Sequence, residues 1–109
     1  MELKQLQKES YEYALIQGFW EEPINIPEKL CLIHSELSEA LEEFRGSFNP
    51  TLYYDEKNNM KPEGFGVELA DAIIRILDLA EFLNIDIEEM IKIKMNYNKG
   101  REYKHGKKC

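Results

Sequence analysis

The fold of this chain is decided by one apolar stretch, residues 67–83, which reads VELADAIIRILDLAEFL. A helix with this sequence carries apolar side chains on nearly every side, and such a helix is normally buried. Its polar exceptions recur at helical spacing, so they form one narrow stripe along the helix. Because burying an unpaired ionised carboxylate costs several kcal/mol, the stripe must meet water, cations or opposite charges. The stripe consists of Glu68, Asp71, Arg75 and Asp78.

A second, amphipathic helix is predicted over residues 27–46, because the segment begins with proline, which is favoured in a first turn, and ends at glycine. Apolar side chains recur along it with helical spacing and define a core stripe. Glu36 and Glu39 lie at the edge of this stripe. If the helix packs against residues 67–83, its acidic pair faces the acidic pair of that stretch. The predicted core stripe consists of Leu30, Ile33, Leu37, Ala40 and Phe44.

The whole chain, residues 1–109, is expected to form one domain built from four helices. Asp86, followed three residues later by Glu89, is a capping box that begins the fourth helix. With hardly any strand signal, the fold class is all-α, an antiparallel four-helix bundle. The third helix is too apolar for a monomer, so subunit association is expected to complete the bundle. The predicted ranges are helices at 2–17, 27–46, 65–84 and 86–98, a loop at 46–66 with a short hairpin around 53–60, and a basic tail at 99–109.

Composition limits the compartment and the partners. The net charge of −7 disfavours nonspecific attraction to a nucleic acid polymer or to an anionic membrane. Cys31 lies within a predicted helix and Cys109 is the last residue, so a structural disulfide is not expected. The first residues lack an apolar signal core, and the chain has no apolar run long enough to span a membrane. A cytoplasmic protein is therefore predicted.

The two acidic pairs favour a hard cation, because they offer only carboxylate oxygens. Mg²⁺ is the expected ion and Mn²⁺ a second candidate. A bound ion of this kind contacts phosphate oxygens and lowers the pKa of a bound water, which is the chemistry of phosphoanhydride hydrolysis. Spacing alone carries little weight, since 21 acidic residues produce several such pairs by chance. The candidate ligands are Glu36, Glu39, Glu68 and Asp71.

Residues 94–108 are strongly basic in an otherwise acidic chain. Lys94, Asn98 and Arg101 lie at helical spacing and are placed to reach one set of phosphates, although a solvated basic terminus that favours the helix dipole explains the same charges. Trp20 is the only tryptophan and follows a glycine between two predicted helices. It is expected either to stack on a nucleobase or to plug the core at the helix junction.

The arrangement of the acids resembles the signature of the MazG-like all-α nucleoside triphosphate pyrophosphohydrolases. In this chain the signature reads Glu36-x-x-Glu39, a 28-residue gap, and then Glu68-x-x-Asp71. Either pair alone is weak, whereas the combination covers most of the chain. The segments that carry the resemblance are residues 34–45, 61–75 and 94–108.

The resemblance implies a Mg²⁺-dependent enzyme that hydrolyses a nucleoside triphosphate between its α and β phosphates, with a role in cleansing the nucleotide pool. It implies that the four acids hold the metal and act in catalysis. It also implies a homodimer or homotetramer with active sites close to the subunit interfaces. The substrate-binding residues that it implies are Trp20, Lys29, Arg75, Lys94, Asn98 and Arg101.

Other functions remain open at the level of sequence. A noncatalytic helical module that binds metal or a partner would use the same bundle. A dinuclear iron bundle usually brings Glu-x-x-His motifs, and neither His34 nor His105 completes one. Arg75 lies one turn from Asp71 and either contacts phosphate or pairs with Asp78. The preferred base and sugar are not encoded in any recognisable motif.

Overall fold

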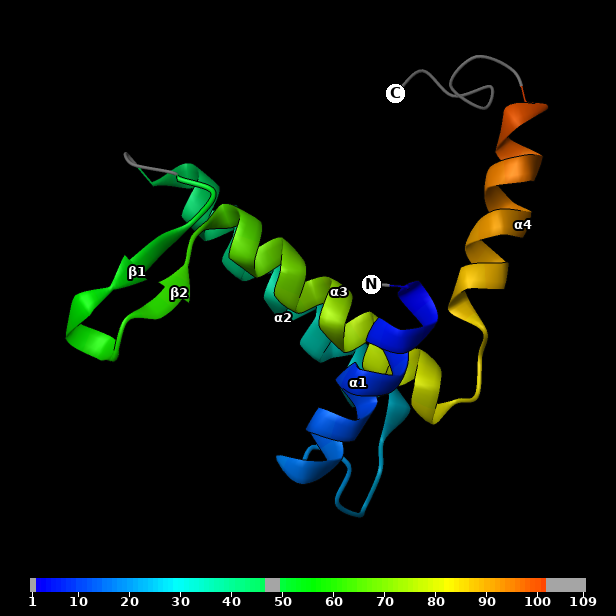
Figure 1. Ribbon diagram of the computed structural model, residues 1–109, viewed down its shortest axis with the longest axis horizontal. Helices are drawn as coiled ribbons and strands as arrows, with labels where there is room; N and C mark the ends of the chain where they lie inside the picture. The colour runs from blue at the N-terminus through cyan, green and yellow to red at the C-terminus, as the bar shows by residue number, and fades with distance from the viewer. Residues whose placement is uncertain (1, 47–49, 102–109) are drawn as a thin grey trace.

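The computed structural model describes residues 2–46 and 50–101. Within these residues the chain forms four helices and one two-stranded antiparallel hairpin, so the predicted helical class is confirmed (Figure 1). The predicted tail beyond residue 101 lies outside the described residues. The elements are α1 (Leu3–Ile16), α2 (Ile26–Arg45), β1 (Tyr53–Asp55), a 3-10 turn (Glu56–Asn58), β2 (Lys61–Glu63), α3 (Phe65–Phe82) and α4 (Ile87–Lys99).

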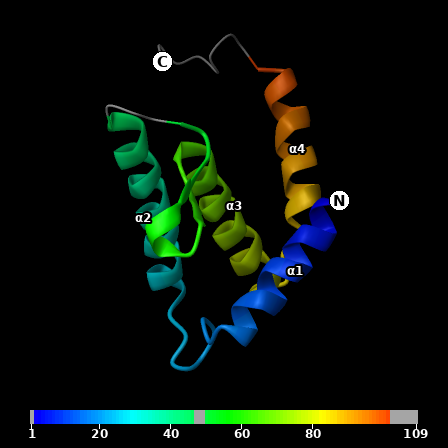
Figure 2. The same cartoon turned by 60° about the vertical axis from the view of Figure 1, so that its left-hand side comes forward.

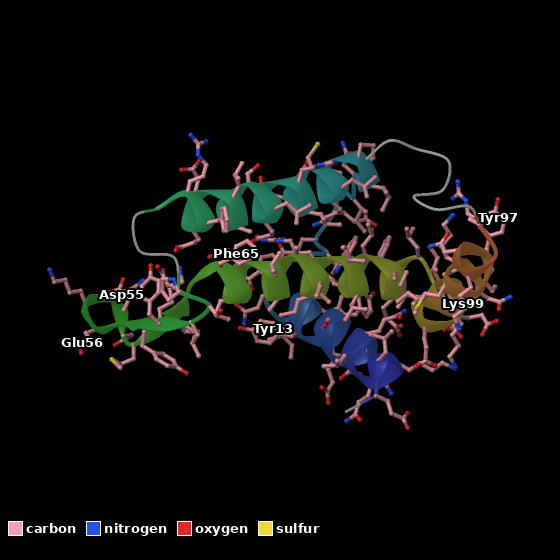
Figure 3. The ribbon with its side chains drawn as sticks, turned by 90° about the horizontal axis from the view of Figure 1, so that it is seen from above. Tyr13, Asp55, Glu56, Phe65, Tyr97 and Lys99 are labelled. Atoms are coloured by element: carbon pink, nitrogen blue, oxygen red, sulfur yellow. The ribbon has the colours of Figure 1, made fainter. Side chains whose placement is uncertain are left out.

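The apolar helix α3 is the centre of the structure. It packs against α2 on one side and α1 on the other, as seen most clearly in Figure 3. The chain leaves α2, passes through the β1–β2 hairpin and returns along α2 as α3, so α2 and α3 are antiparallel neighbours (Figures 1 and 2). This arrangement places the acidic residues of α2 beside those of the first turns of α3.

The starts of α2 and α4 follow from side-chain caps. Asn25 accepts a hydrogen bond from the backbone N–H of Glu28 at 3.1 Å, and Asp86 accepts one from Glu89 at 3.1 Å. Each cap satisfies a backbone donor that the first turn of a helix leaves unpaired. The predicted start of the fourth helix at Asp86 and the predicted end of the second at Gly46 are both confirmed. A hairpin was expected around 53–60. One is present, but it extends further than predicted, because its second strand lies at Lys61–Glu63.

Trp20 is the largest buried side chain of the small core and is only 7% exposed. Its ring stacks on Phe82 with centroids 4.0 Å apart and planes 6° from parallel. The indole N–H donates a hydrogen bond to the Asp78 carboxylate at 2.6 Å. Ala14 and Leu79 complete the cluster. Trp20 therefore fastens the turn between α1 and α2 to the second half of α3.

The predicted core stripe of the second helix is wrong for most of its members. Ala40 is buried and Ile33 is half-buried, but Leu30, Leu37 and Phe44 are 48%, 48% and 56% exposed. The reason is that α3 meets α2 along the face that carries Glu36 and Ala40, which are the two buried residues of α2. Among the described residues, α3 is the helix that packs against α2, and the neighbouring apolar side chains of α2 stay exposed.

The predicted bundle does not close within the described chain, because α4 stands apart from α2 (Figures 1 and 2). Its connection to α3 is held against α1: the Gln7 side-chain amide donates to the carbonyl of Ile85 at 2.8 Å, and Lys4 pairs with Asp86 at 3.5 Å. The Cα radius of gyration is 16.5 Å, against about 13 Å for a compact domain of this length. The chain is therefore more open than a four-helix monomer.

Two of the predictions concerned membrane-spanning segments and the cysteines. Across residues 2–46 and 50–101, every helix is too short or too polar to cross a membrane. The thiol of Cys31 is free and exposed, whereas Cys109 lies outside the described residues.

Gly64 sets the entry into α3, and its replacement by alanine is expected to cost about 1–3 kcal/mol of unfolding free energy. Its φ is +124°, and an added Cβ would lie 2.6 Å from the backbone oxygen of Thr51. The matched control is Gly100→Ala, where φ is not positive and the nearest atom to an added Cβ is 3.8 Å away. Urea unfolding of both variants checks this, and equal stabilities would contradict it.

Candidate metal centre

Three carboxylates from two antiparallel helices converge on one point. Glu36 and Glu39 extend from α2, and Glu68 extends from the first turn of α3. One oxygen of each lies within 4.8 Å of the other two. Glu36 is buried, Glu68 is half-buried and Glu39 is exposed, so the cluster opens to solvent on the Glu39 side. Three of the four predicted ligands are brought together.

Asp71 lies beside this cluster and is not among the three converging carboxylates. It lines a hollow next to Glu36, one helical turn along α3 from Glu68. Partial burial raises the pKa of Asp71, and the negative charge of Glu36 raises it further. The structure thus separates the predicted acidic set into three convergent groups and one flanking group.

Of the four predicted ligands, Glu68 has the most strongly raised pKa. Burial, together with a hydrogen bond shared with Glu39 and the charges of its acidic neighbours, raises its pKa from 4.5 to about 7. Its Oε2 atom is buried and has no hydrogen-bond partner among the described residues. A buried oxygen without a partner, on a carboxylate that converges with two others, fits a hard divalent cation, which would reduce the repulsion between them.

Arg75 ties the cluster to the rest of α3. Its Nε donates to Oε1 of Glu36 at 2.6 Å, and its guanidinium lies 5.6 Å from the centroid of the Phe19 ring. Of the two roles open to Arg75, the pair with Asp78 is not formed: Arg75 pairs with Glu36, and Asp78 accepts a hydrogen bond from Trp20. Arg75 therefore holds the buried Glu36 in place.

A hollow of about 300 Å³ adjoins the cluster between α1 and α3. Phe19, which is about half exposed, forms part of its wall. Sequence reasoning selected its neighbour Trp20 and missed Phe19, because adjacent aromatics in a turn give no sign of which one faces the core. The remaining wall is formed on the α1 side by Ser10, Tyr13 and Ala14, and on the other side by Glu36 of α2 with Asp71, Ile74, Arg75 and Asp78 of α3.

Trp20 and Lys29 were predicted to contact the substrate. In the structure both side chains make contacts within the protein. Phe82 covers the Trp20 ring by stacking, and the Lys29 ammonium lies 4.6 Å from the Trp20 ring centroid. Lys29 also donates to the backbone carbonyl of Phe19. A base contact by Trp20 stays a prediction, and the observed ring environment is that of a core residue.

Lys94, Asn98 and the adjacent Arg101 belong to the α4 end of the chain, away from the carboxylates (Figures 1 and 3). Lys94 and Arg101 place their charges 4.9 Å and 5.4 Å from the ring centroid of Tyr97. The Oδ1 atom of Asn98 is buried without a hydrogen-bond partner among the described residues. Within one chain, the predicted phosphate contacts on α4 do not meet the metal ligands.

Lys61 is a cation at the carboxylate cluster that sequence reasoning did not select. It lies on β2 and, with Glu39 and Glu68, lines a second hollow of about 410 Å³. A 3.3 Å contact with Glu63 raises the pKa of Lys61, and the charges of Glu68 and Asp71 raise it further. The only available signal was its place directly after the expected hairpin at 53–60, because the position of a loop lysine depends on the path of the strands.

Comparison of the chain with family models, with curated protein sequences and with solved structures found no significant match.

The raised pKa of Glu68 predicts how pH affects the stability of the metal-free protein. Between about pH 4.5 and 7 the folded state binds more protons at Glu68 than the unfolded state does. The free energy of unfolding therefore falls as pH rises through this range. Asp71 and Asp78 act in the same direction.

Glu68→Gln is expected to flatten this pH dependence, and Mg²⁺ is expected to restore stability more at pH 8 than at pH 5, since it binds the ionised form. Urea midpoints at the two pH values, with and without Mg²⁺, check both statements. A variant that keeps the wild-type slope would contradict the assignment to Glu68.

Proposed function

We propose that this protein is a Mg²⁺-dependent nucleoside triphosphate pyrophosphohydrolase, producing a nucleoside monophosphate and pyrophosphate. The observation that carries the proposal is the convergence of Glu36, Glu39 and Glu68 within 4.8 Å. A hard cation is the ligand that such a donor set suits best. The motif resemblance supplies the reaction, and the hollows on either side of the cluster supply room for a substrate.

The three convergent carboxylates would hold Mg²⁺ or Mn²⁺. When bound, such an ion neutralises charge on phosphate oxygens and lowers the pKa of a coordinated water. Asp71 is the carboxylate best placed to accept a proton from the attacking water, because it flanks the ligands without joining them and lines the hollow beside Glu36. Arg75 keeps Glu36 oriented through their 2.6 Å contact.

The substrate is expected to lie across the cluster. Lys61 lines the solvent-facing hollow, where a cation favours the triphosphate. Phe19 and the apolar wall of the other hollow offer a surface for the base or the sugar. This placement makes Phe19 and Lys61 the first residues to vary when substrate preference is measured.

The proposal is tested with a panel of standard and modified nucleoside triphosphates, with Mg²⁺ and with Mn²⁺, by measuring pyrophosphate and orthophosphate separately. Pyrophosphate from at least one substrate is expected. Hydrolysis in ¹⁸O-labelled water is expected to place the label in the monophosphate, as attack at the α phosphorus requires. Orthophosphate as the product, or label in pyrophosphate, would rule out the proposed reaction.

The competing function is a noncatalytic helical module that binds metal or a partner. It is favoured by one observation, the broad exposed apolar faces of α2 and α4. It predicts Mg²⁺ binding, measured by calorimetry, without turnover of any nucleotide in the panel. Turnover that requires the three carboxylates would exclude it.

A further inference from the structure

Asp78 is the charged residue of the hollow between α1 and α3 that the proposed metal centre leaves unused. Glu36 and Asp71 belong to the carboxylate set, and Arg75 is paired with Glu36. Asp78 is only 9% exposed and lies on α3 two helical turns, or about 10 Å, beyond Asp71. A buried carboxylate needs hydrogen bonds to offset the cost of its burial, so its partners decide what else it can bind.

One oxygen of the Asp78 carboxylate is occupied and the other is accessible. Oδ1 accepts a hydrogen bond from the Trp20 indole N–H at 2.6 Å, and the described part of the chain supplies no other partner. Within residues 2–46 and 50–101, the side-chain oxygens that are buried without a partner belong to Glu68 and Asn98. Oδ2 of Asp78 is not one of them, so it reaches accessible space, and the hollow that Asp78 lines supplies that space.

The accessible oxygen of Asp78 is an acceptor in a fixed position. Burial raises the pKa of Asp78, whereas the indole hydrogen bond and the charges of Lys29 and Arg75 act in the opposite direction and favour the ionised form. An ionised carboxylate accepts hydrogen bonds and donates none. Oδ2 therefore selects a ligand that presents an N–H or O–H group, and repels one that presents a carbonyl oxygen in the same place.

Phe19 gives the same hollow a flat aromatic wall. Its ring is about half exposed, and the Arg75 guanidinium lies 5.6 Å from the ring centroid. The backbone at Phe19 is held by Lys29, which donates to its carbonyl, and by the buried Trp20 that follows it. A rigid aromatic wall and a fixed acceptor in one hollow of about 300 Å³ suit a planar heterocycle that carries a hydrogen-bond donor.

We propose that Asp78 determines the base specificity of this protein, and that the hollow takes a base with an exocyclic amino group in preference to the same-shaped base with a carbonyl oxygen. Cytosine is then favoured over uracil, and adenine over hypoxanthine. The proposal rests on the proposed function, which puts the phosphates at the metal centre. The separation of Asp78 from Asp71 along α3 leaves room for the sugar between phosphates and base.

The selection has a direct physical cause. An amino group projects beyond the ring and donates to Oδ2, which satisfies both groups. In uracil the ring N–H lies between two carbonyl oxygens, and these would face the carboxylate. A site that holds a buried polar group for a particular donor rejects the analogue without that donor, because the group is then left unpaired.

The wild type is tested first, by comparing kcat/KM for cytidine with uridine triphosphate and for adenosine with inosine triphosphate. In each pair that is hydrolysed, the amino member is expected to be preferred at least about 10-fold. Equal values, or a preference for the carbonyl member, would overturn the proposal. No variant is needed for this comparison, so it does not depend on whether a substitution at Asp78 folds.

Asp78→Asn tests the residue itself. The indole N–H only donates, so the amide oxygen of the new side chain is expected to stay on Trp20 and its NH₂ group to face the hollow. The preference is then expected to invert, with the carbonyl member favoured at least about threefold. Because the ratio is taken within one variant, a smaller folded fraction does not change it. A wild-type ratio in this variant would overturn the assignment to Asp78.

The matched control is Glu81→Gln, which removes the same charge one turn further along α3. Glu81 accepts a hydrogen bond from Gln7 at 3.1 Å and lines a different hollow, at the α3–α4 connection. This variant is expected to keep the wild-type ratio within about twofold. A ratio shifted as far as in Asp78→Asn would show that the preference follows overall charge on α3, and would overturn the proposal.

Binding without turnover separates base selection from the proposed reaction. Calorimetric titration with Mg²⁺ is expected to show that cytidine monophosphate binds at least about 10-fold more tightly than uridine monophosphate, or adenosine than inosine monophosphate. This preference without turnover of any triphosphate would overturn the reaction and retain the base site. Turnover without a difference between paired bases would overturn the base site and retain the reaction. Neither turnover nor binding would overturn both.

Discussion

Replacing Glu68 with glutamine is expected to reduce Mg²⁺-dependent pyrophosphate release at least about 1,000-fold. Glu68 is the only one of the three convergent carboxylates that α3 contributes. Its Oε2 atom is buried without a partner among the described residues, so a cation is its natural counterpart. Glutamine keeps the shape of the side chain and removes the charge, so Mg²⁺ affinity is expected to fall together with the rate.

The matched control is Glu42→Gln, which removes the same charge from α2, the helix that packs against α3. Glu42 lines the neighbouring hollow but is not among the three convergent carboxylates. Its contact with Arg45 is 3.9 Å long and exposed, so its loss is expected to change the rate less than about threefold. Similar rates for the two variants would show that Glu68 acts through general negative charge or not at all.

Replacing Trp20 with alanine is expected to lower the free energy of unfolding by about 3–5 kcal/mol. The substitution removes the stack on Phe82 and leaves a cavity at the junction of α1, α2 and α3. It also leaves the buried Asp78 carboxylate without its hydrogen bond from the indole. Since small domains are stable by only about 5–15 kcal/mol, a loss of this size is measurable by urea unfolding and large enough to impair folding.

Two further variants separate the cost of losing the ring stack from the cost of losing the hydrogen bond to Asp78. Trp20→Phe keeps an aromatic ring against Phe82 but leaves Asp78 unpaired, and is expected to cost about 1–3 kcal/mol. Combining it with Asp78→Leu removes the stranded charge and is expected to recover part of that loss, because two apolar groups replace the broken pair. A Trp20→Ala variant as stable as the wild type would show that the indole is not a core residue in solution.

The helices and their caps were readable from local sequence. Asp86 with Glu89, and proline followed by glycine at the two ends of residues 27–46, are signals that depend only on backbone groups a few residues away. The facing of the acidic pairs was also predictable in outline, because an apolar α3 with one polar stripe leaves few ways to pack. Convergence of Glu36, Glu39 and Glu68 agrees with that outline.

Other features depended on how the helices meet. Leu37 and Glu36 are neighbours in the sequence, and a small rotation of α2 decides which of them faces α3; the periodicity favoured Leu37, and the structure buries Glu36. The orientation of Phe19 and Trp20 also depends on the tertiary structure. The turn after α1 directs the Trp20 ring to the core and the Phe19 ring to the hollow. Lys61 lines the hollow beside Glu39 and Glu68 because β2 leads directly into the start of α3.

The amino-acid sequence by itself determined where the helices begin and end, because capping and helical periodicity act over a few residues. It also determined that an apolar helix with an acidic stripe would form the centre of the fold. Tertiary structure alone decided that Asp71 flanks the three convergent carboxylates and that α4 lies away from them. These outcomes depend on helix rotation and on the path of the α3–α4 connection, which arise from contacts between residues far apart in the chain.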